Sequence, residues 1–150
     1  MALRPDRHEL DTDISFFMNE TASRGVVVSF STAGSGASMD NAAALATVAA
    51  DASGSFPLGI LLNDMVNLDL TRQHINQHKD EVQKGGKITI LRKGWCVTDQ
   101  VNGTPTKGQT AYLADSGKLS ATQEAGAVAV GAFLSVKDAD GFAKVAINLP

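Results

Sequence analysis

Residues 126–150 constrain the fold most, because they contain a recognisable β-hairpin. Two β-rich runs, 128–136 and 142–149, flank the tetrapeptide Asp-Ala-Asp-Gly at 138–141. The Asp-Gly step supplies the positive backbone φ that a tight hairpin turn requires. The second run shows the alternation of a strand with one buried face, in which the apolar positions are Ala143, Val145, Ile147 and Leu149. The remaining chain must therefore supply a sheet with which this hairpin pairs.

Strand and turn signals recur along the rest of the chain. Strands are predicted over 25–31, 87–101 with a bulge or kink at Gly94, and 112–113. Residues 40–51 suit a helix or a strand, and we favour a strand because a β-domain would use it. Turn signals at 102–103 and 115–117 separate these runs, and 102–103 indicates a second hairpin. This spacing predicts an all-β fold, namely a small β-barrel or β-tulip or a sandwich, with the last hairpin closing a barrel.

Two stretches interrupt the strand pattern. The apolar run 56–62 contains Pro57 and Gly59, so we expect it at an edge or a bend of the sheet. Residues 66–84 are polar and contain few aromatic residues, which indicates a surface helix or a long excursion from the sheet. We expect 25–150 to form one β-rich core domain that carries this excursion.

The N-terminal residues differ from the core in character. Residues 1–13 are polar and aperiodic, which predicts an extended or mobile arm. They are followed by the apolar cluster Phe16, Phe17 and Met18. Burying an aromatic side chain stabilises by about 1.5–3 kcal/mol, so the cluster will cover either the core of its own chain or a partner's surface. We treat 1–24 as an N-terminal unit of arm and cluster.

The charge and cysteine content exclude several classes of protein. The net charge is −3 with acidic and basic residues interspersed, which disfavours direct binding to nucleic acid or to a membrane surface. Cys96 is the single cysteine, so an intrachain disulfide is impossible, and a buried inert thiol is expected. The charged N-terminus does not resemble a signal peptide, and no apolar run has the length of a membrane span. We expect a soluble protein.

Motifs for catalysis or metal binding are weak. His74 and His78 have the i, i+4 spacing of a zinc site on a helix, but no third ligand is apparent. The pair Asp138 and Asp140 matches only part of a calcium loop, and turn chemistry explains it better. The glycines around Ser35 lack the context of a phosphate-binding loop, and no nucleophile elbow occurs. We therefore expect a protein that is not an enzyme and uses no cofactor or metal.

Four segments carry a family resemblance: 56–62, 86–94, 105–112 and 129–133. Their glycines and apolar residues, taken in order, resemble the head decoration or cement proteins of tailed bacteriophages, including the β-tulip type represented by the phage lambda decoration protein. The resemblance spans roughly residues 56–150. The excursion at 66–84 is longer than a minimal member of that family would need.

The resemblance implies a non-enzymatic protein that is made in the host cytoplasm and located on the outer capsid surface of the virion. It implies binding to the major capsid protein, commonly as a homotrimer, and stabilisation of the shell by bridging of capsid subunits. An N-terminal arm that reaches across capsid subunits would give residues 1–18 a role. The expected partner contacts are Arg4, Arg7, Phe16, Phe17 and Met18.

Two alternatives stay open. The protein could be a receptor- or glycan-binding module of a virion or cell surface, with 66–84 as its recognition loop. It could also be a small metal-dependent enzyme centred on His74 and His78.

Overall fold

The structure is a computed structural model that describes residues 3–34, 36, 43–62, 68–69, 74–75 and 81–150. These residues form fifteen β-strands and one 3-10 turn, which confirms the all-β class. The elements are β1 (Leu3–Asp13), β2 (Phe17–Met18), β3 (Ala22–Ser23), β4 (Val27–Ser31), β5 (Leu45–Thr47), β6 (Pro57–Leu62), β7 (Leu68–Asp69), β8 (His74–Ile75), β9 (Glu81–Val82), β10 (Thr89–Thr98), β11 (Val101–Asn102), β12 (Thr110–Leu113), η1 (Asp115–Gly117), β13 (Leu119–Ser120), β14 (Ala129–Phe133) and β15 (Ala143–Asn148).

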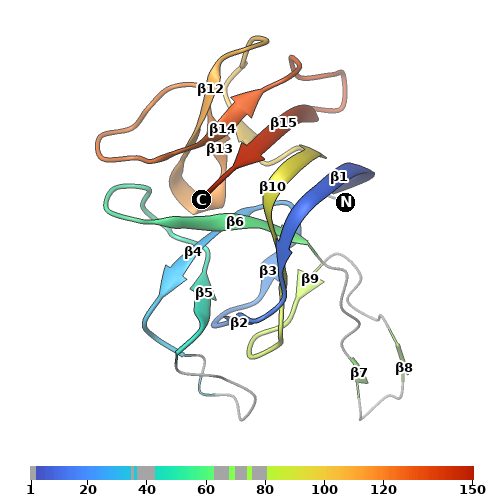
Figure 1. Cartoon of the computed structure of the whole chain (residues 1–150), viewed down its shortest axis with the longest axis vertical. Coiled ribbons are helices and arrows are strands. Elements are labelled where there is room, and N and C mark those ends of the chain that lie inside the picture. The colour runs from blue at the N-terminus through green and yellow to red at the C-terminus, as the bar shows by residue number, and fades with distance from the viewer. Residues whose placement is uncertain (1–2, 35, 37–42, 63–67, 70–73, 76–80) are drawn as a thin grey trace.

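Most strands belong to one open sheet. Its hydrogen-bonded order is β11-β13-β12-β14-β15-β10-β6-β4-β5-β2, and β1 pairs with β10 beside this path. In Figure 1, β12, β14 and β15 lie above β6, while β4, β5 and β2 lie below it. Two small pairs, β3 with β9 and β7 with β8, complete the described strands. Because the order does not return to its starting strand, the expectation of a closed barrel is wrong.

Strand β10 joins the two tiers of the sheet. Its first residues, Thr89 to Leu91, pair with β6, and the following part, from Lys93 to Thr98, pairs with β15. These two partners share one edge, so β1 occupies the opposite edge of β10. Gly94 lies at the junction with φ +137°, and the register of β1 shifts opposite it. The predicted irregularity at Gly94 is therefore confirmed.

Strand β6 lies in the interior of the sheet, so its predicted place at an edge is wrong. Its register with β4 shifts between Gly59 and Pro57, an irregularity that agrees with the alternative prediction of a bend. All six of its residues are buried between β10 and β4. Pro57 is the first residue of the strand, a position that tolerates the missing N–H. A Cβ atom at Gly59 would lie 2.4 Å from the carbonyl oxygen of Leu91. The glycine therefore permits a close approach of β6 to β10 rather than marking an edge.

The two faces of β6 contribute to two separate hydrophobic cores. Leu58 and Leu61 belong to one core, whereas Ile60 and Leu62 belong to the other. The first core includes Met18 and Ile88 and extends towards β2 and β9. The second, larger core extends into the hairpin of the C-terminal tier. Strand β6 thus separates the cores and helps to form both.

The C-terminal hairpin forms as predicted. Strands β14 and β15 are antiparallel, and Gly141 in their connection has φ +85°. The four alternating apolar residues are all buried, and they are Ala143, Val145, Ile147 and Leu149. However, β15 also pairs with β10 and β14 with β12, so the hairpin lies inside the sheet. Its predicted role as the seam of a barrel is wrong.

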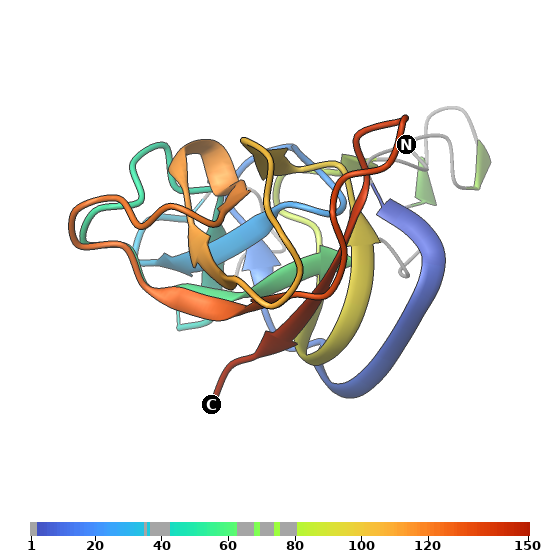
Figure 2. The same cartoon turned by 90° about the horizontal axis from the view of Figure 1, so that it is seen from above.

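The predicted N-terminal arm is extended, but it is a strand of the sheet rather than a free segment. Strand β1 pairs antiparallel with β10 from Leu3 to Asp13, with three shifts of register. Leu3 is fully buried, whereas most of the following side chains are exposed. Figure 2 shows β1 curving around the outer side of β10. The division of the chain into units 1–24 and 25–150 stays a prediction.

The remaining local predictions have mixed outcomes. Strands are confirmed at β4, β5 and β12, and η1 provides the predicted turn at 115–117. The hairpin predicted at 102–103 is wrong: Gly103 has φ +68°, but β11 pairs in parallel with β13. A positive φ creates only the local turn and does not determine which strand pairs next. Much of the predicted excursion at 66–84 lies outside the described residues. Within this range the structure describes the short strands β7, β8 and β9.

Candidate interaction surface

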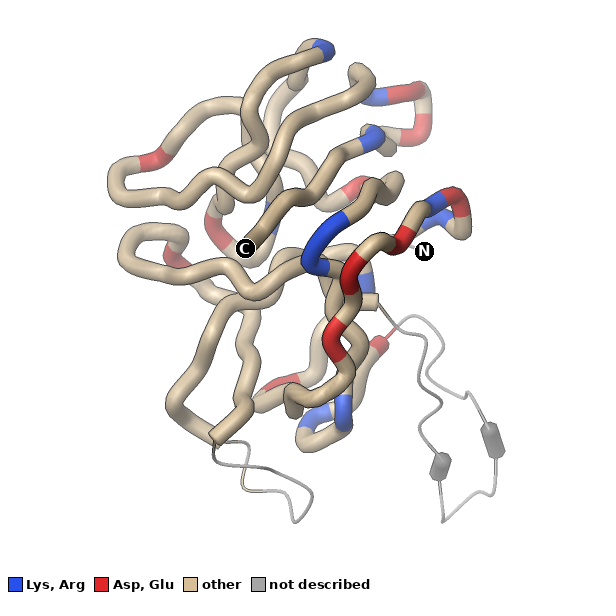
Figure 3. Tube along the Cα trace, viewed as in Figure 1, with Lys and Arg blue, Asp and Glu red and all other residues tan. Residues whose placement is uncertain are grey.

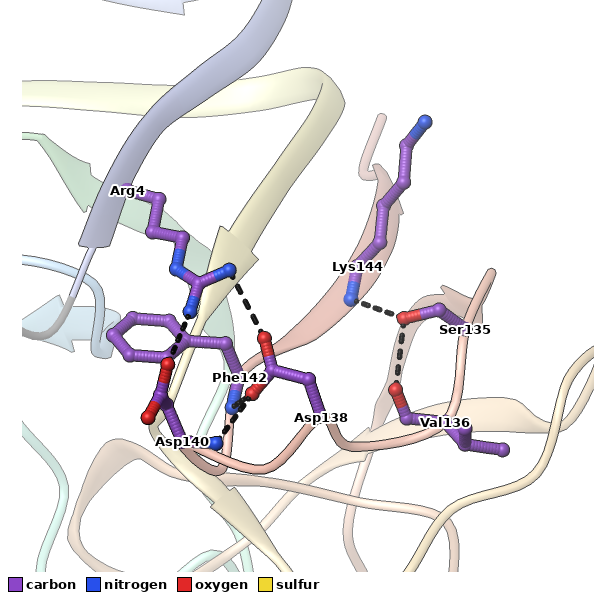
Figure 4. Close-up of polar contacts among 7 residues, drawn as sticks. All are labelled: Arg4, Ser135, Val136, Asp138, Asp140, Phe142 and Lys144. Carbon is purple, nitrogen blue, oxygen red and sulfur yellow. Dashed lines mark hydrogen bonds and ion pairs between the residues drawn. The ribbon is translucent and has the colours of Figure 1, made fainter.

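Arg4, at the start of β1, forms ion pairs with the connection between β14 and β15. Its guanidinium Nη1 lies 2.9 Å from Oδ2 of Asp138, and Nη2 lies 3.2 Å from Oδ2 of Asp140. The guanidinium carbon lies 4.2 Å from the ring centroid of Phe142, in cation–π contact (Figure 4). We call these four residues the Arg4 clasp. Arg4, predicted as a partner contact, is thus engaged within its own chain.

Asp138 has two tasks in the Arg4 clasp. Its Oδ1 accepts backbone N–H bonds from Asp140 and Phe142, each at 2.9 Å. The bond from Phe142 is the main reason why the pKa of Asp138 lies below its usual value, and the bond from Asp140 and the nearby Arg4 act in the same direction. Asp138 therefore shapes the turn while it binds Arg4, as turn chemistry predicts.

Arg7 lies farther along β1 and is also engaged within the chain. Its Nε forms an ion pair with Oε1 of Glu9 on the same strand. Arg7 is paired in register with Cys96 of β10, whose thiol is fully buried. Burial raises the pKa of the Cys96 thiol to about 12, and the charge of Arg7 lowers it only in part. The expected burial of this thiol is confirmed.

The apolar cluster after β1 divides between core and surface. Met18, the second residue of β2, is fully buried in the core that also contains Leu58 and Leu61. Phe16 is half-buried against the same core. Phe17 is half-buried, and the Nζ of Lys87 lies 5.9 Å from its ring centroid. The structure thus places the cluster on its own chain, while a partner contact by Phe16 or Phe17 stays a prediction.

Phe16 is part of a larger aromatic surface. Its ring meets that of Phe30 edge to face, with centroids 5.9 Å apart. The backbone N–H of Phe30 donates to the carbonyl of Phe56, so these residues lie opposite each other at the ends of β4 and β6. Directly opposed residues of antiparallel strands point to the same face. Phe30 and Phe56 remain 51% and 68% exposed, and we call Phe16, Phe30 and Phe56 the aromatic patch.

Sequence reasoning did not find the aromatic patch. It identified Phe16 as a contact but treated Phe30 as part of a strand and Phe56 as part of an edge run. The available signal for Phe30 and Phe56 was their position beside polar, glycine-containing segments at the ends of predicted strands. That signal indicates exposure, but it does not reveal that Phe16 meets Phe30 or that Phe56 lies opposite Phe30.

No group of side chains suited to hold a metal ion is found in the part of the chain that the structure describes. Within it, no three His, Cys, Asp or Glu side chains are grouped to hold a metal ion. Glu124 has its pKa raised by desolvation and by neighbouring Asp115, which already accepts the N–H of Ala52. His78 lies outside the described residues, so the zinc hypothesis with His74 stays untested.

The described residues thus form an open, all-β scaffold whose accessible groups are suited to contacts with other surfaces. They include no helix with the length and apolar character needed to span a membrane. The family model of the XM1 gp53 minor capsid protein matches residues 6–148, so the chain belongs to this family. No curated protein matches the sequence. The protein is therefore a structural protein of a phage capsid, as the sequence resemblance implied in part.

Proposed function

We propose that the protein decorates the outer surface of the phage head and stabilises the shell by bridging subunits of the major capsid protein. The aromatic patch carries this proposal. Two phenylalanines expose more than half of their surface, and exposed aromatic groups of this kind mark sites of protein contact. Membership of a minor capsid protein family supports a partner within the shell.

Burial of the aromatic patch would provide useful binding energy. Burying a whole aromatic side chain contributes about 1.5–3 kcal/mol, so the exposed parts of Phe30 and Phe56 together contribute about 2–3.5 kcal/mol. We further propose a homotrimer, because three such patches on one particle engage the shell with high effective concentration. Modest contacts from each copy then add up to stable attachment.

The role of the aromatic patch is tested by co-sedimentation of the purified protein with phage heads from which this protein is absent. The double variant Phe30→Ala/Phe56→Ala should attach about thirtyfold more weakly per site or worse, given the energy above. Leu134→Ala, which also truncates an exposed apolar side chain, is the matched control and should attach normally. Unchanged attachment of the double variant would refute the role of the patch. Melting temperatures of both variants verify that the fold is intact.

Two further measurements test the rest of the proposal. Heads carrying the protein should release less DNA on heating than bare heads, and antibodies should reach the protein on intact heads. Light scattering of the free protein should give the mass of three chains. A protein that antibodies reach only in opened heads would contradict the outer location, and a monomer mass would contradict the trimer.

A further inference from the structure

Strand β1 is an open edge of the large sheet. It pairs with β10 along one side, and no strand in the described ranges pairs with its other side. At eleven residues, it is the longest strand that the structure describes. The free side of an edge strand presents N–H and C=O groups that can receive a further strand. The fold therefore contains a potential acceptor for an extended segment.

The charge of β1 restricts which segment this edge can accept. The strand carries four carboxylates and two guanidinium groups, so its charge of −2 is most of the −3 of the whole chain. Both arginines are already engaged, Arg4 in its clasp and Arg7 with Glu9. Asp6 and Asp11 are exposed and form no ion pair with another described residue. Acidic residues consequently dominate this edge, as the red segments along β1 show in Figure 3.

An exposed apolar side chain lies between the carboxylates. Glu9 pairs with Gly94 and Asp11 with Lys93, so Leu10 is the extra residue of a β-bulge. The Leu10 side chain is 72% exposed, the most of any large hydrophobic residue in the described part of the chain. A matching segment would place basic side chains near the two aspartates and an aliphatic side chain near Leu10.

The same features disfavour a second copy of β1 as the occupant. Two copies would oppose one acidic strand to another, and like charges on facing strands destabilise the pairing. Pro5 and the register shifts also protect the edge from indiscriminate pairing. The selectivity of the edge therefore depends on an incoming strand of opposite charge.

We propose that the free edge of β1 binds an extended segment of another shell protein, in which lysine or arginine alternates with aliphatic residues. The segment adds to the sheet antiparallel or parallel to β1, and its cations face Asp6 and Asp11. The inference rests on the proposed function in one respect, namely that the binding partner is a protein of the phage shell. The chemistry of the edge itself can be tested without phage heads.

The probe is a synthetic peptide of about nine residues, a typical strand length, in which lysine alternates with valine. Hydrogen exchange of the full-length protein should slow within 3–13 when this peptide is added. A peptide with glutamate in place of lysine should bind at least tenfold more weakly, and binding of the lysine peptide should weaken as salt rises. Asp6→Lys/Asp11→Lys should weaken binding of the lysine peptide about tenfold.

The matched control is Asp51→Lys/Glu81→Lys, which makes the same change of charge at exposed positions outside β1 and should bind normally. Equal binding of the two peptides, no binding of the lysine peptide, or protection only outside 3–13 would overturn the proposal. Protection of 3–13 by the protein's own association, without peptide, would identify a second copy as the occupant and also overturn it.

Attachment to heads separates this proposal from the proposed function. If heads bind the wild type and Asp6→Lys/Asp11→Lys equally, the edge proposal is wrong while decoration stands. If heads do not bind the wild type, decoration is wrong, and the peptide experiment alone decides the chemistry of the edge.

Discussion

Replacing Gly94 by alanine tests whether close contact between β1 and β10 holds the N-terminal strand in place. The added Cβ would lie 2.0 Å from the carbonyl oxygen of His8, a distance at least 1.0 Å shorter than real Cβ contacts allow. Relief requires the two strands to separate by about 1 Å, which is enough to break a backbone hydrogen bond. Overpacking of this kind costs about 1–3 kcal/mol, and the positive φ adds about 1 kcal/mol. We expect a total of about 3 kcal/mol.

Gly103→Ala separates the steric cost from the conformational cost. Gly103 also has positive φ, but a Cβ at this position meets no atom within 4 Å. It should cost only about 1 kcal/mol. In urea unfolding, with a slope of about 2 kcal/mol per molar, the midpoint should fall by about 1.5 M for Gly94→Ala and 0.5 M for the control.

Hydrogen exchange identifies how the protein accommodates Gly94→Ala. Because β1 is an edge strand, the change should increase exchange in 3–13 more than in β6 or β15. Equal midpoints for the two glycine variants would refute the reasoning, and so would full protection of 3–13 in a destabilised Gly94→Ala protein.

Other predictions follow from burial and charge. Arg4→Met should lower stability by about 1 kcal/mol in thermal unfolding, because two partly exposed ion pairs and a cation–π contact are lost. The pKa of Asp138 lies below its usual value of 3.8, so the ionised carboxylate stabilises the folded protein fully above pH 3.8. This stabilisation is lost as the pH falls through the pKa of the folded state. The difference in unfolding free energy between the wild type and Asp138→Asn should therefore shrink over that pH range. Met18→Ala should cost about 2–5 kcal/mol in denaturant unfolding, whereas the half-buried Phe17→Ala should cost less. Cys96 should react with a thiol reagent only after unfolding, and rapid labelling of the native protein would contradict its burial.

The local signals in the sequence predicted strands better than they predicted pairing. Alternation and an Asp-Gly turn were enough for the final hairpin, since both its strands and its turn are local. They were not enough for β6, whose glycine meets Leu91 in another strand. They also could not reveal β1 as a sheet strand, because an edge strand with exposed, charged side chains has no apolar alternation beyond Leu3.

The candidate interaction surface was harder to predict than the strands, because its residues come together through contacts between positions far apart in the sequence. Arg4 was identified as a contact residue, but its clasp includes Asp140, which is 136 positions away. Phe16 was also identified, but it meets Phe30 only in the folded chain, and Phe56 lies opposite Phe30 because β4 and β6 are neighbours in the sheet. Sequence patterns indicate which side chains are available for contact, and the fold decides which of them meet.

The position of β1 beside β10 has a consequence for protein synthesis. The ribosome releases β1 long before β10, and the turn that closes the Arg4 clasp follows 136 positions after Arg4. At roughly 5–20 residues per second, β1 waits on the order of ten seconds for the last of these contacts. A strand that waits unpaired is exposed to association with other nascent chains, and charged side chains oppose such association. We therefore expect the acidic residues of β1 to oppose association of the nascent chain until its own partner strand has been made.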